Sequence, residues 1–334
     1  MENSKVIDSV INSTAVINNN YYDDSFKYLN EELRSFFNDQ NITDIMINGL
    51  NSIYIEKKGT VTCIDSLLSE QELYRLIDSI AQYNSRSIDI NHPVFDGKMN
   101  GGIRCNVVMP PISIDGVTIT LRKHINEIDS WDVLIKNKML DDKMAEILKK
   151  SVDKKLNLIV SGGTGTGKTT LINVLLNGLC ETTQRVITIE DTAELRLKIP
   201  HVIRLESRRS TPDCPYEVSI RELVKTALRM RPDRIVIGEV RGEEAYDLLH
   251  AVNTGHRGCL CSIHANSCRD VLRRFETLAI LGHPNLDISV PRTWIASNIH
   301  LIVHLSKEEG VRKIVELKSI EGVECGNYIL HDLI

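Results

Sequence analysis

No apolar run in the 334-residue chain approaches the ~18 to 20 residues that a membrane-spanning helix requires. The first residues, MENSKVIDSVINSTAVINNN, lack the basic and apolar regions of a signal peptide. A composition of 42% hydrophobic and 25% charged residues is that of a soluble globular protein. These absences together predict a protein that stays in the cytoplasm.

Strong positive charge is also missing. Residues 1–130 contain 11 Lys and Arg against 18 Asp and Glu, and the remainder contains 29 against 27. Neither part has the basic balance, or the interleaved aromatic and basic residues, of a protein that binds nucleic acid through phosphates and stacked bases. A translocase acting on nucleic acid remains an alternative, and stimulation of the activity by DNA would distinguish it.

Cys-x₂-Cys pairs are absent, although the chain has eight cysteines. Their irregular spacing in a chain of this length argues against a disulfide framework, so reduced thiols are expected. A zinc site is the alternative for GHRGCLCSIHAN, which contains His256, Cys259, Cys261 and His264. This stretch alternates as a buried strand does, which places the cysteines and His264 on opposite faces. We therefore expect both cysteines to pack as small buried hydrophobic residues.

The patterning changes near residue 130. An Asn- and Ser-rich tail over 1–22 precedes a predicted α+β domain over 23–123, which includes a helix over 24–38 and a capping box formed by Ser69 and Glu72. A linker is predicted over 124–130, before a helix capped by Ser130. From 131 to 334, apolar segments such as LNLIV, RVITI, RIVI and GCLCSI alternate with helical segments. That alternation predicts an α/β domain with a mainly parallel sheet.

A phosphate-binding loop is the clearest motif. GGTGTGKT, residues 162–169, matches G-x-x-x-x-G-K-[ST] and lies between the strand LNLIV and the helix-like TLINVLLNGL. Its backbone amides can surround phosphate, Lys168 can reach the β- and γ-phosphates of ATP, and the Thr169 hydroxyl can bind Mg²⁺. The predicted nucleotide-binding residues are Gly162, Gly163, Thr164, Gly165, Thr166, Gly167, Lys168, Thr169 and Thr170.

Three further strands end in residues suited to hydrolysis. RVITIE ends in Glu190, RIVIGE ends in Glu239, and GCLCSIH ends in His264. In a parallel sheet these ends meet at the edge that holds the phosphate loop. We assign Glu190 to polarise the attacking water, Glu239 to hold the Mg²⁺ shell through water, and His264 to sense the γ-phosphate. Asp191 and Glu194, in EDTAE, are rivals for the first role.

Arginines could supply further positive charge to the γ-phosphate, either by domain closure or from a neighbouring subunit. Arg104 and Arg122 lie on predicted strands of the first domain. The candidates in the second domain are Arg204, Arg208, Arg209, Arg229 and Arg241.

Four segments in order resemble the Walker A, Asp, Walker B and His boxes of the type II and type IV secretion ATPases. They are SGGTGTGKTT, ITIEDTAEL, ALRMRPDRIVIGEVRG and NTGHRGCLCSIHANS. The third and fourth look most like the CpaF branch, which serves tight-adherence (Tad) pilus assembly. DIMINGLNSIYIEKKG and GGIRCNVVMPPISIDGVTITLRK resemble the family's N-terminal domain, so the likeness extends over about residues 42–305.

The resemblance implies a RecA-like P-loop core in a homohexameric, Mg²⁺-dependent ring ATPase at the cytoplasmic face of the membrane. Such a motor powers pilus assembly or secretion, and it associates peripherally with the membrane through an inner-membrane platform protein. The resemblance assigns Glu190 as the catalytic acid of the Asp box, Glu239 as the Walker B acid, and His256 and His264 as the His-box pair. It also assigns Arg104 and Arg122 as phosphate contacts.

The chain departs from the family pattern in four places. STPDCPYE, residues 210–217, replaces a more glycine-rich loop, and CLCS stands where SLST is common. The four-cysteine zinc element of the type II branch is absent, and the N-terminal extension is short. Two other functions remain alternatives: a nucleotide-gated binding module without turnover, and a P-loop kinase, for which no acceptor site is visible.

Overall fold

The computed structural model describes residues 29–57, 59–65, 68–99, 102–123, 130–178, 183–210, 215–308 and 310–334. The chain divides into two compact units, residues 1–125 and 126–334. Among the described residues, no helix is long and apolar enough to cross a membrane. The predicted tail over 1–22 and most of the predicted linker lie outside the described residues.

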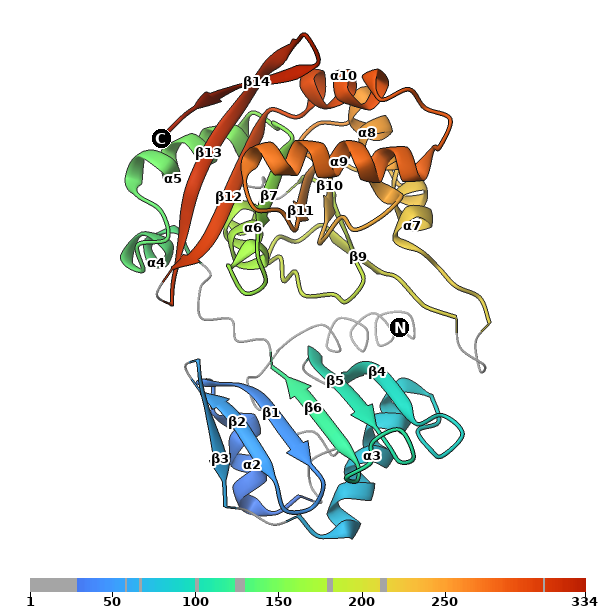
Figure 1. Cartoon of the computed structure of the whole chain (residues 1–334). Helices are drawn as coiled ribbons and strands as arrows, with labels where there is room; N and C mark the ends of the chain where they lie inside the picture. Colours follow the sequence, from blue (N-terminus) through green and yellow to red (C-terminus); the bar gives the residue numbers. More distant parts are fainter. Residues whose placement is uncertain are drawn as a thin grey trace, which may run out of the picture. The chain divides into compact units, whose positions relative to one another are not determined.

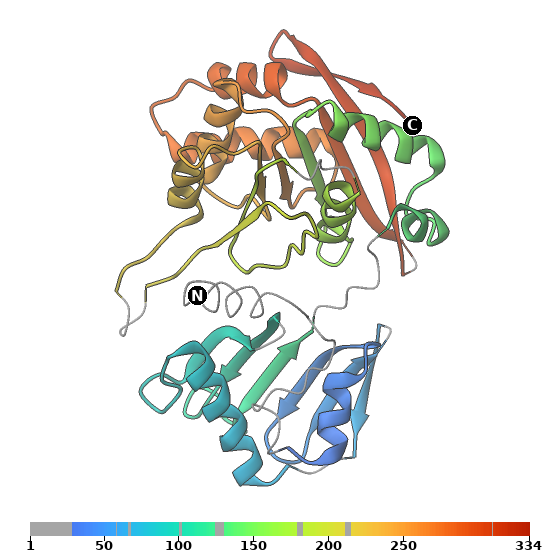
Figure 2. The same ribbon diagram turned by 180° about the vertical axis from the view of Figure 1, so that it is seen from behind.

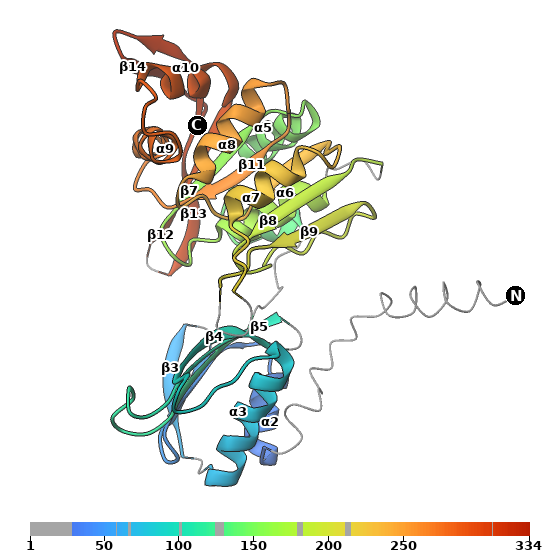
Figure 3. The same ribbon diagram turned by 90° about the vertical axis from the view of Figure 1, so that its right-hand side faces the viewer.

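The first unit is a six-stranded antiparallel sheet with two helices. Its strand order is β3-β2-β1-β6-β5-β4. Helices α2 and α3 pack on one face of this sheet, as Figure 3 shows from the side. The elements are α2 (Glu31–Asn38), β1 (Ile42–Asn48), β2 (Ile53–Lys57), β3 (Thr60–Ile64), α3 (Glu70–Asn84), β4 (Val94–Met99), β5 (Ile103–Val108) and β6 (Thr118–Arg122).

Local signals explain these elements. The predicted capping box is present at the start of α3, where Ser69 and Glu72 each bond the backbone of the other. Helix α2 begins at Glu31, and its buried residues are Leu33 and Phe37, whereas Phe36 is only partly buried. The part of the predicted helix before Leu29 lies outside the described residues.

The second unit contains seven helices and eight strands among the described residues. They are α4 (Trp131–Lys136), α5 (Asp142–Asp153), β7 (Leu158–Gly162), α6 (Lys168–Asn177), β8 (Val186–Glu190), β9 (Val202–Glu206), α7 (Ile220–Ala227), β10 (Arg234–Ile237), α8 (Glu244–Asn253), β11 (Leu260–Ile263), α9 (Cys268–Gly282), α10 (Ser289–Asn298), β12 (Leu301–Glu308), β13 (Val311–Glu324) and β14 (Asn327–Asp332). As predicted, Ser130 caps α4 by accepting a hydrogen bond from Val133 N.

One eight-stranded sheet organises this unit, in the order β14-β13-β12-β7-β11-β10-β8-β9. The six strands from β12 to β9 are parallel to their neighbours, and β13 and β14 add an antiparallel edge. Helices α7, α8, α9 and α10 cover one face (Figure 1), and α4, α5 and α6 cover the other (Figure 2). The carboxyl ends of the parallel strands therefore share one edge of the sheet.

Strand β11 has the two faces that its sequence predicts. Cys259, Cys261 and Ile263 pack in the core beneath α7 to α10, whereas Leu260 packs on the side of α6. Burial raises the pKa of Cys259 to about 12 and that of Cys261 above its usual range. The cysteines thus pack as buried hydrophobic residues, facing away from His264.

Candidate active site at the carboxyl ends of the parallel strands

The phosphate-binding loop connects β7 to α6. Gly162 has φ +147°, and a Cβ there would lie 2.4 Å from the carbonyl oxygen of Leu305 on β12, so only glycine fits. The Thr166 hydroxyl closes the loop by donating to the Gly163 carbonyl at 2.9 Å. Thr164, Gly165 and Gly167 complete the turn, and Thr169 and Thr170 lie half-buried in the first turn of α6.

Lys168 is folded back onto this loop. Its Nζ donates to the carbonyl oxygens of Gly162 and Gly163, both at 2.9 Å. Burial lowers the pKa of Lys168 from its ordinary value, although the negative charge of Glu239 opposes the shift. No acidic residue occupies the first turn of α6, so the positive end of the helix dipole is directed at the loop without a competing charge there.

Glu239 and His264 lie beside Lys168. His264 Nε2 is 3.1 Å from Glu239 Oε1 and 3.4 Å from Lys168 Nζ. Burial, with the nearby charge of Lys168, lowers the pKa of His264, which favours a neutral ring. Nε2 of the neutral ring can donate a hydrogen bond to Glu239 or accept one from Lys168, but it cannot do both. The tautomer of His264 therefore determines which of the two hydrogen bonds forms.

Arg241 holds the other oxygen of Glu239. Its Nη2 donates to Glu239 Oε2 at 2.6 Å. Burial would raise the pKa of Glu239, but this hydrogen bond and the charges of Arg241, His264 and Lys168 outweigh it and leave the pKa below its ordinary value. Glu239 is therefore a carboxylate at neutral pH.

Glu190 is the last residue of β8 and is only 3% exposed. Its Oε1 accepts hydrogen bonds from the backbone amides of Glu194 and Leu195, both at 2.9 Å. Its Oε2 is buried and has no hydrogen-bond partner among the described residues. Burial raises the pKa of Glu190 to about 7. A carboxyl group with that pKa exchanges protons readily at neutral pH, which suits a general base.

Asp191 and Glu194, the rivals of Glu190, follow it in the same turn. Asp191 accepts from the Ser207 hydroxyl at 2.9 Å and lies 3.6 Å from Arg241 Nη1. Glu194 is half-buried, and its negative charge acts on Lys168. Glu194 is therefore the rival whose charge reaches the lysine of the phosphate loop, whereas Asp191 interacts with Ser207 and Arg241.

His256 is not brought to this cluster. It precedes β11 and lies at the amino end of that strand, where its Nδ1 is 3.2 Å from the carbonyl oxygen of Ala251. Because β11 is parallel to β7, this is the edge opposite to the phosphate loop. The strand thus separates the predicted pair of histidines within one chain.

Arg104 and Arg122 lie in the first unit, opposite each other on β5 and β6. Arg122 Nε donates to Asp44 Oδ1 at 2.8 Å. In the second unit, Arg204 donates to the Ala193 carbonyl near Glu190, and the exposed Arg229 follows α7.

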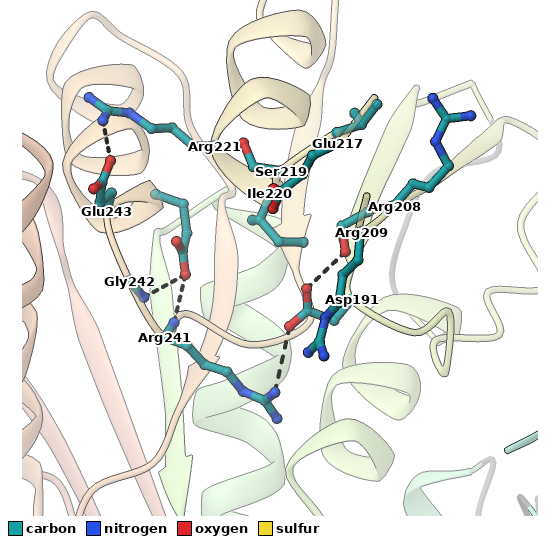
Figure 4. A pocket seen from close by; sticks show the side chains of 13 residues that line it. Asp191, Arg208, Arg209, Glu217, Ser219, Ile220, Arg221, Arg241, Gly242 and Glu243 are labelled. Carbon is teal, nitrogen blue, oxygen red and sulfur yellow. Dashed lines mark hydrogen bonds and ion pairs between the residues drawn. The ribbon is translucent and has the colours of Figure 1, made fainter. Parts of the chain in front are cut away.

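A pocket of about 330 Å³ lies at the base of the segment that joins β9 to α7. Figure 4 shows Arg241 extending along it toward Asp191, with Arg209 nearby. Arg241 thus connects this pocket to Glu239. The residues that line it are Asp191, Ser207, Arg208, Arg209, Glu217, Val218, Ser219, Ile220, Arg221, Arg241, Gly242, Glu243 and Glu244.

Two contacts at the site were not predicted from sequence. Arg312 of β13 donates from Nε to the Gly165 carbonyl at 3.0 Å. His304 of β12 places Nδ1 2.9 Å from the hydroxyl of Ser161, the residue before the phosphate loop. Both residues come from strands that follow the phosphate loop by more than 100 positions, so no signal near the loop in the sequence predicts these contacts.

The Thr169 hydroxyl and the Glu239 carboxylate are suitable protein oxygens for a phosphate-bound Mg²⁺. Such an ion takes one or two protein oxygens, and water and phosphate oxygens complete its shell. The Thr169 hydroxyl and the ionised Glu239 supply oxygens of that kind. Because both Glu239 oxygens already have protein partners, a bridging water suits it better than direct coordination. Among the described residues, no group of three or more His, Cys, Asp or Glu could hold a metal by itself.

Comparisons with known proteins agree with this geometry. The family model described as type II/IV secretion system protein matches residues 30–314. The type IV secretion system protein PtlH of Bordetella pertussis is 30% identical over 322 residues, which cover 88% of this chain and 94% of PtlH. The conjugal transfer protein TrbB of Rhizobium radiobacter is 29% identical over 303 residues, or 90% of each chain.

The solved structures show the same fold. The X-ray structure of the ATPase DotB of Legionella pneumophila aligns with a TM-score of 0.60 and 22% identity. The alignment covers 86% of this chain and 80% of DotB. Both units take part in a match of that extent.

Proposed function

Because the chain belongs to the type II/IV secretion system protein family, we propose that it is an ATPase that powers protein secretion or pilus assembly. One observation carries this proposal. The phosphate loop with Lys168 lies at the same sheet edge as Glu190, Glu239 and His264, which end three neighbouring parallel strands. Triphosphate hydrolysis needs these parts together: a phosphate cradle, a fixed positive charge, an oriented water and a metal shell.

Nucleotide binding would rearrange Lys168. Its Nζ now satisfies the carbonyls of Gly162 and Gly163. The β- and γ-phosphates of ATP are stronger acceptors for an ammonium group, so Lys168 turns toward them. His264 Nε2 then loses its contact with Lys168 and keeps the one with Glu239. The imidazole ring can then form a hydrogen bond with the γ-phosphate.

For hydrolysis we assign Glu190 to orient and deprotonate the attacking water, with Glu194 as the rival residue. Mg²⁺, when bound, would neutralise charge on the β- and γ-phosphates. The Thr169 hydroxyl would contact it directly, and Glu239 would contact it through water. Arg241 keeps Glu239 ionised and oriented for that role.

The finer assignment follows the motifs. We propose a homohexamer of the CpaF branch that serves Tad pilus assembly, on the cytoplasmic face of the membrane and in contact with an inner-membrane platform protein. Within the ring, Arg104 and Arg122 would contact phosphate, and His256 would act at a subunit boundary, since its own chain holds it away from the phosphate loop. The first unit, predicted over 23–123, would move relative to the ATPase domain, predicted over 131–334.

Replacing Lys168 by Ala tests the proposal. We expect Lys168→Ala to abolish phosphate release from ATP because the β- and γ-phosphate charges lose their fixed counter-charge. Circular dichroism should show an unchanged fold, since among the described residues the Lys168 ammonium hydrogen-bonds to carbonyls of its own loop and to His264. Turnover near that of the wild type would refute the nucleotide site. A large stimulation of the wild-type rate by DNA would favour a nucleic-acid translocase instead.

A further inference from the structure

The hairpin of β12 and β13 extends beyond the end of β7, beside the phosphate loop. The two strands stay paired past Leu305, which is the β12 partner of the last residue of β7. Leu305 packs on the side of α6, and Lys307, two positions later on the same strand, points to that side as well. Arg312 of β13 is directly opposite Lys307 and shares its face. Both cations therefore lie on the face of the hairpin where α6 begins.

Arg312 is held against the phosphate loop by one of its donors. Its Nε donates to the Gly165 carbonyl at 3.0 Å, and its Cδ would lie 3.4 Å from a Cβ added to Gly167, the residue before α6. The side chain thus runs along the loop toward the start of the helix. A guanidinium group has five N–H donors, and Arg312 makes no second hydrogen bond or ion pair with the described residues. Its exposed Nη groups are therefore available to a ligand.

Lys307 adds a second positive charge at the same place. It is exposed, and it forms no ion pair with a residue that the structure describes. Glu308, the next residue of β12, points to the other face of the hairpin, because successive side chains on a strand alternate. Like charges in directly opposed positions destabilise a pair of strands, so an anion bound beside Lys307 and Arg312 would relieve their repulsion.

The order of the strands indicates which end of a nucleotide Arg312 can reach. Strands β12 and β13 lie on one side of β7, and β11, β10 and β8 lie on the other. The residues proposed for hydrolysis end β11, β10 and β8, so the γ-phosphate has to point to their side of the loop. The backbone amides of a phosphate loop surround the α- and β-phosphates. The α-phosphate therefore lies toward β12 and β13, the side from which Arg312 approaches.

We propose that Arg312 contacts the α-phosphate of the bound nucleotide through its Nη groups while its Nε stays bonded to Gly165, and that Lys307 adds positive charge beside it. One guanidinium can bind a carbonyl and a phosphate oxygen together, because its donors are fixed in one plane. The contact is the same before and during cleavage of the bond to the γ-phosphate, so it strengthens binding without accelerating hydrolysis. This inference rests on the proposed ATPase function, which supplies the nucleotide.

Arg312→Met tests the inference in the full-length protein. We expect the Kd for ATP to rise about tenfold, the effect of losing one charge-assisted hydrogen bond. The kcat should stay within about twofold of the wild type, because the lost contact is made equally in the ground state and the transition state. Tripolyphosphate, which has the phosphates of ATP without the nucleoside, should lose affinity by the same factor. Lys307→Met should lose less affinity for both ligands, and neither variant should melt below the unliganded wild type, since both side chains are exposed.

Lys313→Met is the matched control, because it removes one positive charge from the next position of β13, which points to the other face. It should bind ATP and tripolyphosphate as the wild type does. An Arg312→Met protein that kept its ATP affinity, that lost kcat instead of affinity, or that lost affinity for ATP but not for tripolyphosphate would overturn the inference. If the wild type bound ATP without hydrolysing it, the proposed function would fall, while the measured affinities would still decide whether Arg312 contacts the α-phosphate.

Discussion

At the level of single residues, the two carboxyl oxygens of Glu190 have different roles. Its Oε1 anchors the backbone of Glu194 and Leu195, which is a structural role, while its buried Oε2 has no partner among the described residues. An unpaired buried carboxylate oxygen is costly, so it is retained where a proton has to be moved. This explains why the end of β8 carries a glutamate beneath Gly238, whose missing side chain leaves the space for it.

Glu190→Gln should lower ATP turnover about 10²-fold or more, the usual effect of removing a positioned base, while nucleotide affinity persists. Because the base must be ionised, wild-type turnover should decline as the pH falls below about 7. Single-turnover phosphate release and nucleotide titration measure the two properties. Glu194→Gln is the comparison variant: if it lost more turnover than Glu190→Gln, the base role would pass to Glu194.

The same residue predicts a dependence of stability on pH. The folded protein raises the pKa of Glu190 from 4.5 to about 7, so it binds this proton more tightly than the unfolded chain does. The associated stability is fully present below pH 4.5 and is lost as the pH rises through 7. Glu190→Gln should therefore be more stable than the wild type at pH 8.5, and the difference should shrink toward pH 5. Urea unfolding at both pH values measures it, and a variant equally destabilised at both would contradict this explanation.

At the level of elements, the sequence predicted β7, β8, β10 and β11 because each is an apolar run of four to six residues followed by a turn. It also placed the phosphate loop and its three neighbouring strand ends, because parallel strands carry their functional residues at one edge. Strands β13 and β14 were not predicted. Both carry several charges and lack a continuous apolar run, and they are held as hairpin strands, β13 by pairing with β12 and β14 by pairing with β13.

The phosphate loop that connects β7 to α6 allows a prediction about Gly162. Gly162→Ala should weaken ATP binding strongly and lower the free energy of unfolding by about 1 to 3 kcal/mol, because its Cβ would clash with the Leu305 carbonyl and the Thr166 hydroxyl. Gly165→Ala is the control, since Gly165 also has a positive φ, +73°, but a Cβ added there meets no atom within 4 Å. Calorimetric titration with ATP compares them. An equal loss of ATP affinity in both variants would show that glycine is needed at Gly162 for its positive φ and not for the lack of space for a Cβ.

At the level of the whole molecule, the residues that we propose for the active site belong to two compact units, residues 1–125 and 126–334. The phosphate loop, Glu190, Glu239 and His264 belong to the second unit, whereas Arg104 and Arg122 belong to the first. ATP hydrolysis can drive a movement of the first unit if Arg104 and Arg122 contact the nucleotide phosphate in only part of the hydrolysis cycle. His256, which lies at the far edge of its own sheet, fits the same scheme if a neighbouring subunit completes the site.

The central claim is that ATP turnover requires an assembled ring, and turnover measured across dilution tests it most directly. Specific activity per chain should be followed alongside mass from light scattering, for the wild type and for Arg104→Ala and Arg122→Ala. We expect activity per chain to rise with concentration until the hexamer is complete, and the two variants to lose turnover while their assembly is retained. A protein that stays monomeric, whose activity per chain does not change on dilution and which neither substitution affects, would contradict the claim.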